Sequence, residues 1–484
     1  MMELINKYKR ISIQTKAAIW FSLCNLFIKG ISFITVPLFT RIMSNEEYGT
    51  LSLFLAYEQI AMILATWEIQ MGAYQKGIFK YKNNINIFTK STLALINLLT
   101  IVFYFIIAII HGWISQITGM SSIIIILLFI YMIVQPSYNC WLVRKRTVYE
   151  YKSAVIMTLI YSLANVFVPM LALLLINNTA EIKFESTLIV SSILCLVFYI
   201  PYSNYWKLKN KITMVKEYWD FLLRFEGPLV LHSLSYLVLS QADRIMIGNM
   251  VGKAEAAYYS IAYSFASIVN LLQSSINQSL LPWRYQMLEE KEYKKIRSVT
   301  NYLLFVMMVL ILLFILIAPE IMKLLFTNNY YDAVWSIPPI AASVYFMFLY
   351  TIFVNIESYF EQTKYVVYVS VTCGIVNLFL NYICIRCFGY IACGYTTLFS
   401  YILFALGHYY FMSKIISKEI LGVNLFDKKF IFMLSVLLVL LSVVFTIFYQ
   451  WWVIRYSFIL TIIFVIFLAK KHFVSLIRKS REAS

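Results

Sequence analysis

The sequence has few charged residues and no long polar segment. Only 13% of its 484 residues are Asp, Glu, Lys or Arg, whereas a soluble globular domain carries about 25%. Hydrophobic residues make up 61% of the chain. This composition excludes a string of soluble domains and predicts a membrane protein that crosses the bilayer many times.

The sequence also lacks the motifs of several common chemistries. It contains no GxGxxG, Walker A, HExxH or GxSxG sequence. Its histidines are too far apart to form a metal-ligand spacing, at His111, His232, His408 and His472. The one CxxC, Cys384 to Cys387, stands at a predicted helix end without a second pair, and the odd, scattered set of seven cysteines argues against a disulfide framework. We therefore expect no metal, no cofactor and no enzymatic activity.

Apolar segments recur along the whole chain. A helix needs about 20 apolar residues to cross the hydrocarbon layer, and fourteen segments qualify: 17–39, 49–71, 91–112, 121–143, 154–176, 187–206, 219–240, 256–282, 300–318, 334–356, 365–386, 391–412, 430–450 and 453–469. The last two are separated by Arg455 in a run that is only just long enough for two passes. No loop exceeds about 20 residues, which leaves no room for a soluble domain.

Basic residues alternate with these spans. If the N-terminus is cytoplasmic, the cytoplasmic segments collect 31 of the 40 Lys and Arg residues. The outer loops then hold seven: Arg41, Lys183, Arg244, Lys253, Lys323, Arg386 and Arg455. One missed span would invert every later loop, so the pattern predicts fourteen spans with both termini cytoplasmic. It also explains the net charge of +17 without a nucleic-acid partner.

A short motif occurs twice at equivalent places. Arg41-Ile42-Met43 returns as Arg244-Ile245-Met246, 203 residues later, each at the predicted outer end of the first helix of its half. The offset covers six spans, an even number, so the halves enter the membrane in the same direction as parallel repeats. We predict an all-α membrane protein with a six-helix lobe at 1–210, a second at 211–415, and two appended helices with a tail at 416–484.

The segments that carry the repeat also resemble a known family. They read KGISFITVPLFTRIMSNEEYG at 29–49 and QADRIMIGNMVGKAEAAYYSIAYSF at 241–265. Together with the arrangement of six, six and two helices over the whole length, they are similar to the polysaccharide (O-antigen repeat-unit) flippases. Their superfamily also contains multidrug-and-toxin extruders and lipid II flippases. The resemblance implies two lobes in a V around a central cavity that opens alternately to the cytoplasm and the periplasm.

The same resemblance implies a cargo and a location. The cargo would be an oligosaccharide on undecaprenyl diphosphate, moved from the cytoplasmic to the periplasmic leaflet of the bacterial inner membrane. The pathway would be the synthesis of O-antigen, the polysaccharide part of lipopolysaccharide, or of another surface polysaccharide. The partners would be membrane lipid, the lipid-linked glycan and other membrane proteins of polysaccharide assembly.

Two charged residues are predicted near the middle of the membrane. Lys29 lies about 12 residues into the first span and Glu58 about 9 residues into the second, which runs back. A charged side chain at this depth normally faces a cavity or a partner. Either Lys29 and Glu58 form a structural ion pair, or Lys29 lines the cavity and attracts the diphosphate or acidic sugars. Without an ATP site, Glu58 is our candidate for a proton or sodium coupling site.

Other candidates follow from position. His232 precedes Arg244 by 12 residues, as Lys29 precedes Arg41. His232 is therefore the predicted counterpart of Lys29. It could hydrogen-bond a sugar, titrate, or be a satisfied interior side chain. Arg224, near the cytoplasmic side, could bind the diphosphate or extend to lipid phosphate.

A gate at the outer rim is a further hypothesis. Asp243 and Arg244, at the predicted end of the seventh span, could contact the turn at Arg41 when the outer side closes, or could be ordinary boundary residues. The remaining acidic residues near inner helix ends are expected to be solvated: Glu68, Glu357 and Glu361.

Two alternatives to a flippase remain open. A cation-coupled multidrug extruder of the same superfamily would need an anionic cavity, and Lys29 and Arg224 argue against one. A membrane glycan polymerase would need catalytic residues in a large outer loop, and the loops here are too short for it.

Overall fold

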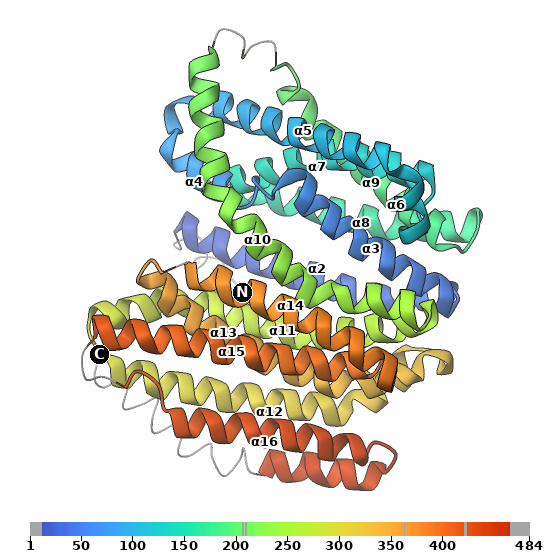
Figure 1. Ribbon diagram of the computed structural model, residues 1–484, viewed down its shortest axis with the longest axis vertical. Helices are drawn as coiled ribbons and strands as arrows, with labels where there is room; N and C mark the ends of the chain where they lie inside the picture. The colour runs from blue at the N-terminus through green and yellow to red at the C-terminus, as the bar shows by residue number, and fades with distance from the viewer. Residues whose placement is uncertain (1–11, 206–207, 209–210, 363, 421–423, 465–484) are drawn as a thin grey trace, which may run out of the picture. The chain divides into compact units, whose positions relative to one another are not determined.

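The protein is described by a computed structural model (Figure 1), which covers residues 12–464 except 206–207, 209–210, 363 and 421–423. Almost all of the described residues are helical, and none of them forms a strand. The predicted all-α class is therefore confirmed. Since lipid offers no hydrogen bonds to an exposed backbone, a helix is the structure that such apolar runs must adopt.

The helices follow one another with short connections. In the first half they are α2 (Ile13–Ile42), α3 (Asn45–Thr66), α4 (Ala73–Lys80), α5 (Ile85–Ile109), α6 (His111–Thr118), α7 (Ser122–Thr147), α8 (Tyr151–Leu175) and α9 (Ala180–Tyr199). In the second half they are α10 (Ile212–Met250), α11 (Lys253–Glu289), α12 (Tyr293–Leu325), α13 (Ile337–Tyr359), α14 (Lys364–Phe388), α15 (Ala392–Glu419) and α16 (Lys428–Ile447), followed by a short apolar helix at Trp452–Phe464. The 3₁₀ segments η1 (Lys82–Asn84), η2 (Ile200–Tyr202) and η4 (Asn328–Ser336) lie between them.

Each predicted span overlaps one of these helices. Eleven helical segments of the described chain are long and apolar enough to cross a membrane. Neither α11 nor α15 is among them, and the last predicted span, 453–469, extends beyond the described residues. The total of fourteen crossings thus stays a prediction.

Several helices are longer than the apolar pattern indicated. The seventh span was expected to end at residue 240, but α10 continues to Met250. Asp243 and Arg244 therefore lie inside a helix and not at its end. The sixth span was expected to begin at residue 187, whereas α9 begins at Ala180. Both differences arise because polar residues near a helix end can stay helical when neighbouring helices bind their side chains.

Helix starts are marked by side-chain caps that the sequence supplies. Ser44 accepts a hydrogen bond from the Glu47 backbone N–H at 3.3 Å and so begins α3 at Asn45, with two residues between the two helices. Thr179 caps α9 in the same way, and the Glu47 carboxylate accepts the Ala180 N–H at 2.5 Å. These bonds satisfy backbone donors that a helix start leaves open, and they join the first turns of α3 and α9.

The chain divides into two compact units, residues 1–237 and 238–484. The division falls inside α10, because the early part of that helix belongs to the core of the first unit. There Tyr218 and Leu222 are buried with Tyr74 and Phe88 in one apolar cluster. The predicted lobe boundaries at 210/211 and 415/416 remain predictions.

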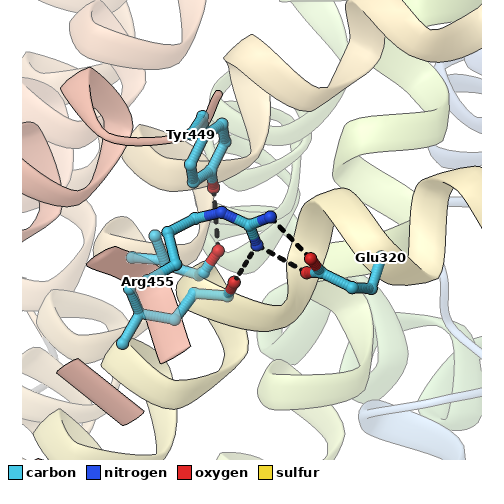
Figure 2. Close-up of polar contacts among 5 residues, drawn as sticks. Glu320, Tyr449 and Arg455 are labelled. Carbon is cyan, nitrogen blue, oxygen red and sulfur yellow. Dashed lines mark hydrogen bonds and ion pairs between the residues drawn. The ribbon is translucent and has the colours of Figure 1, made fainter. Parts of the chain in front are cut away.

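The last described helix is fastened to the second unit by a buried arginine (Figure 2). Arg455 donates to both carboxylate oxygens of Glu320 on α12 at 2.5 Å and to the Leu316 carbonyl at 2.8 Å. Beside it, the Tyr449 hydroxyl donates to the Ile315 carbonyl at 3.0 Å. The prediction that Arg455 lies in a loop was wrong, since it lies in the helix Trp452–Phe464, where Glu320 neutralises its charge.

Candidate functional site

A carboxylate is buried at the centre of a polar cluster in the second unit. Asp243 on α10 is fully buried. One of its oxygens accepts a hydrogen bond from the Asn381 amide of α14 at 2.6 Å. The other accepts from the Thr397 hydroxyl of α15 at 2.6 Å and from the Tyr259 hydroxyl of α11. Four helices thus meet at a single acidic side chain.

The cluster extends through a second layer of neutral oxygen-bearing groups. The Thr396 hydroxyl donates to the Asn381 side-chain oxygen. The Asn381 amide also donates to Asn377 at 3.2 Å, and the Asn377 amide donates to Ser400 at 3.2 Å. All four of these residues are buried. Carboxylate, amide and hydroxyl oxygens are the ligands that hard cations prefer.

Asp243 forms no direct ion pair with another described residue, although the neighbouring Arg244 interacts with it electrostatically. The Arg244 guanidinium lies 4.7 Å from the ring centroid of Tyr263 and donates to Gln241. Burying a carboxylate that is not neutralised is expensive, so the cluster is suited to taking up a proton or a small cation.

Two interior charges of opposite sign lie in the first unit. Glu58 on α3 interacts electrostatically with Lys183 on α9. Lys183 is only 8% exposed, and its ammonium lies 5.2 Å from the ring centroid of Phe39 on α2. Tyr131 and Tyr161 hydrogen-bond to each other and interact with Glu58. The assignment of Lys183 to an outer loop was wrong, because α9 begins early enough to bring it into the helix bundle.

Lys29 has a different environment. It is exposed on α2, and the described residues show no ion pair between Lys29 and Glu58. Glu58 has Lys183 as its electrostatic partner instead. The structural ion pair with Glu58 is thus not formed, and the proposed role of Lys29 in the cavity stays a prediction.

Arg224 and His232 both lie on α10. Arg224 is exposed and donates to Asp220 one turn earlier at 2.7 Å, an ion pair on the helix surface. His232 is partly exposed.

Of the predicted gate residues, Arg41 is exposed in the last turn of α2, while Asp243 and Arg244 belong to the buried cluster described above. The substrate-binding and gate roles stay predictions.

Acidic residues near helix ends are not all solvated as expected. Glu357 on α13 is fully buried, and both of its oxygens lie 3.0–3.1 Å from Nδ1 of the equally buried His408 on α15. Glu68 is half-buried in the turn after α3. Burial raises the pKa of its carboxyl above the ordinary value, and a hydrogen bond with Ser233 offsets only part of this effect. Sequence reasoning missed Lys183 and His408 as partners because nothing local to either residue indicates which helix it faces.

Long apolar helices with charged and polar side chains buried among them are typical of multi-pass membrane transporters. The comparison with family models supports this class. The model for polysaccharide biosynthesis proteins matches residues 15–288, more than half of the chain. The chain belongs to this family. The model for MatE, the multidrug-and-toxin extruder family, matches residues 228–383.

Related proteins agree with this assignment. A protein of the Lsg locus of Haemophilus influenzae is 23% identical over 269 residues; the match spans 54% of this chain and 64% of that protein. Among solved structures, the lipid II flippase MurJ in an inward closed conformation has a TM-score of 0.66 at 14% identity, over 95% of this chain and all of MurJ.

A multidrug resistance transporter of the MATE family, in an inward-facing conformation, also shares the fold. Its TM-score is 0.62 at 11% identity, over 82% of this chain and 98% of that one. The resemblance to polysaccharide flippases predicted from the sequence is confirmed. The chain is a multi-pass membrane transporter of the superfamily that unites multidrug, oligosaccharidyl-lipid and polysaccharide exporters.

Proposed function

We propose that this protein flips an oligosaccharide repeat unit linked to undecaprenyl diphosphate from the cytoplasmic to the periplasmic leaflet by alternating access. The product would serve the synthesis of O-antigen or another surface polysaccharide. The observation that carries the proposal is Lys29, an exposed ammonium in the apolar helix α2 of a polysaccharide biosynthesis protein. A charge at mid-membrane costs about 2.5–3.5 kcal/mol, so its retention favours an anionic ligand such as a diphosphate.

The energy source in this proposal is an ion gradient. Glu58 remains the proposed coupling group in the first unit, where Lys183 balances its charge. The surroundings of Asp243 support a second coupling group in the other unit, since a fully buried carboxylate without an ion pair is stabilised by any bound proton or cation. Uptake at Asp243 would change the hydrogen bonds that hold α10, α11, α14 and α15 together.

The location is part of the same proposal. We place the protein in the bacterial inner membrane with both termini in the cytoplasm, on the basis of the distribution of Lys and Arg. Its partners would be membrane lipid, the lipid-linked glycan and other membrane proteins of polysaccharide assembly.

The test is transport of defined lipid-linked glycans in proteoliposomes. We expect the purified protein to move undecaprenyl-diphosphate oligosaccharides between leaflets, as measured by their accessibility to a membrane-impermeant glycan-modifying reagent. In cells, loss of the protein should leave the lipid-linked repeat units on the cytoplasmic leaflet. Their accumulation on the periplasmic leaflet, unpolymerised, would support a polymerase. Efflux of organic cations without glycan movement would support the multidrug extruder, whose fold this chain shares.

A further inference from the structure

An apolar groove follows the side of the second unit between α15 and α16. Its volume is about 520 Å³. The floor is formed by α13 through Phe346 and Leu349, one wall by α15 through Ala405, and the other by α16 through Val436 and Val439. Of these helices, α13 and α16 are long and apolar enough to cross a membrane. The groove therefore favours a hydrocarbon chain over water.

A smaller, polar cavity adjoins this groove. That cavity has a volume of about 340 Å³ and shares Tyr409 and Lys428 with the apolar groove. It is lined further by the polar residues Ser413, Ser417 and Asn424. The two cavities together have the polarity of an amphiphile: an apolar part, and a hydrogen-bonding part that shares a lysine with it.

The charge at the junction is positive and available. The Lys428 ammonium lies 5.8 Å from the ring centroid of Tyr409, and the ion pairs of the described chain do not include it. The adjacent carboxylate, Asp427, caps α16 by accepting the Phe430 N–H at 3.1 Å. An anionic head group at this position therefore meets a cation that forms no ion pair with any described acidic residue.

The surrounding sequence also carries a net positive charge. Residues 413–429 carry four lysines and two acids: Lys414, Lys418, Lys428 and Lys429 against Glu419 and Asp427. This segment is predicted to face the cytoplasm, where the leaflet surface is negative and basic pockets between membrane helices bind anionic head groups.

We propose that the groove binds an anionic phospholipid of this leaflet, with an acyl chain between α15 and α16 and its phosphate at Lys428. Such a lipid would fill the space between α16, one of the predicted appended helices, and α15 of the predicted six-helix repeat. It would contact side chains of both helices along the groove. This proposal does not depend on which cargo the protein carries.

The test is native mass spectrometry of the purified full-length protein with equal amounts of phosphatidylglycerol and phosphatidylcholine. We expect retention of phosphatidylglycerol over phosphatidylcholine, and about a fivefold loss of that retention in Lys428→Ala, the effect of one lysine at a lipid phosphate. Lys429→Ala is the matched control, because Lys429 is exposed on the same turn and lines neither cavity.

A second pair of variants tests the apolar part. Val436→Trp fills the groove and should displace the acyl chain, whereas Leu437→Trp alters the adjacent exposed position outside the groove and should not. Both sites are about 40% exposed, at 41% and 39%, so neither change disturbs the core. Equal retention of the two lipids, or equal effects of Lys428→Ala and Lys429→Ala, would overturn the proposal. Displacement of phosphatidylglycerol by a polyprenyl phosphate at equal concentration would also overturn it, in favour of a carrier-lipid tail.

Discussion

Nδ1 of His408 lies 3.0–3.1 Å from both carboxylate oxygens of Glu357, and neither side chain is exposed. The pair connects α15 to α13 inside the second unit. The Tyr350 ring stacks 5.8 Å from the imidazole and the Phe404 ring meets it edge-on at 4.8 Å, measured between ring centroids. Aromatic rings around the pair lower the local dielectric. The loss of either group therefore leaves the other at a high energetic cost.

Removal of one partner of this pair should therefore destabilise the protein. His408→Ala leaves the Glu357 carboxylate buried without its partner, a change that costs about 3–5 kcal/mol in comparable pairs. Glu357→Gln keeps the shape and a hydrogen-bonding side chain, and should cost much less. Thermal unfolding in detergent, followed by tryptophan fluorescence, compares the two. Equal stability of His408→Ala and the parent protein would contradict the observed pairing.

Asp243 should govern the ion dependence of transport. Asp243→Asn removes the charge but preserves the size and hydrogen-bonding capacity of the side chain within the Asn381, Thr397 and Tyr259 cluster. We expect this variant to fold and to lose its response to a sodium or proton gradient in proteoliposomes. Asp332→Asn is the control, since Asp332 is an exposed acid of the same unit. A variant that retains the full gradient response would remove Asp243 from the coupling mechanism.

Lys29 should determine the affinity for the anionic cargo. We expect Lys29→Ala to lower the transport rate of a diphosphate-linked glycan at least tenfold, because a charge-assisted contact to phosphate contributes about 1.5–3 kcal/mol. Lys29→Arg should retain much of the rate. Lys152→Ala, at an exposed position on α8, serves as the control for a general loss of positive charge. Initial rates in proteoliposomes decide the question, and an unchanged rate in Lys29→Ala would exclude Lys29 from binding.

Glu58 and Lys183 should show coupled effects on stability. Either Glu58→Gln or Lys183→Met alone leaves one interior charge without its partner, whereas the double variant removes both charges. The double variant should therefore be less destabilised than the sum of the single variants, by about 0.5–3 kcal/mol in a mutant cycle. Denaturant unfolding of the four proteins measures this energy. Additive effects would show that the two groups do not interact, and full transport by Glu58→Gln would exclude Glu58 as a coupling group.

Much of the fold could be predicted from the sequence because membrane helices are specified locally. About 20 apolar residues in a row predict a span wherever they occur, and each of the fourteen predicted segments overlaps a helix. The Ser44 cap is equally local. Helix ends were less predictable: α10 continues past Asp243 and Arg244 because the interior of the second unit provides partners for their polar side chains.

The candidate sites could be predicted only in part. Glu58 and Asp243 stood out because a carboxylate in or beside an apolar run requires an explanation. Their partners could not be found in this way. Lys183 and Asn381 lie more than 100 residues away from Glu58 and Asp243 respectively, on helices with apolar residues around most of their circumference. Such helices show no periodic stripe to indicate which face meets a neighbour.

The sequence by itself determined that this chain is an all-α, multi-pass membrane protein of the polysaccharide flippase type. Apolar runs of about 20 residues span hydrocarbon as helices, and the family resemblance lies in short local segments. Only the tertiary structure decided which charges are neutralised and by which partners. It pairs Arg455 with Glu320 and His408 with Glu357, and it surrounds Asp243 with neutral donors. These pairings depend on which helix faces meet, a property of the packed bundle that no single segment encodes.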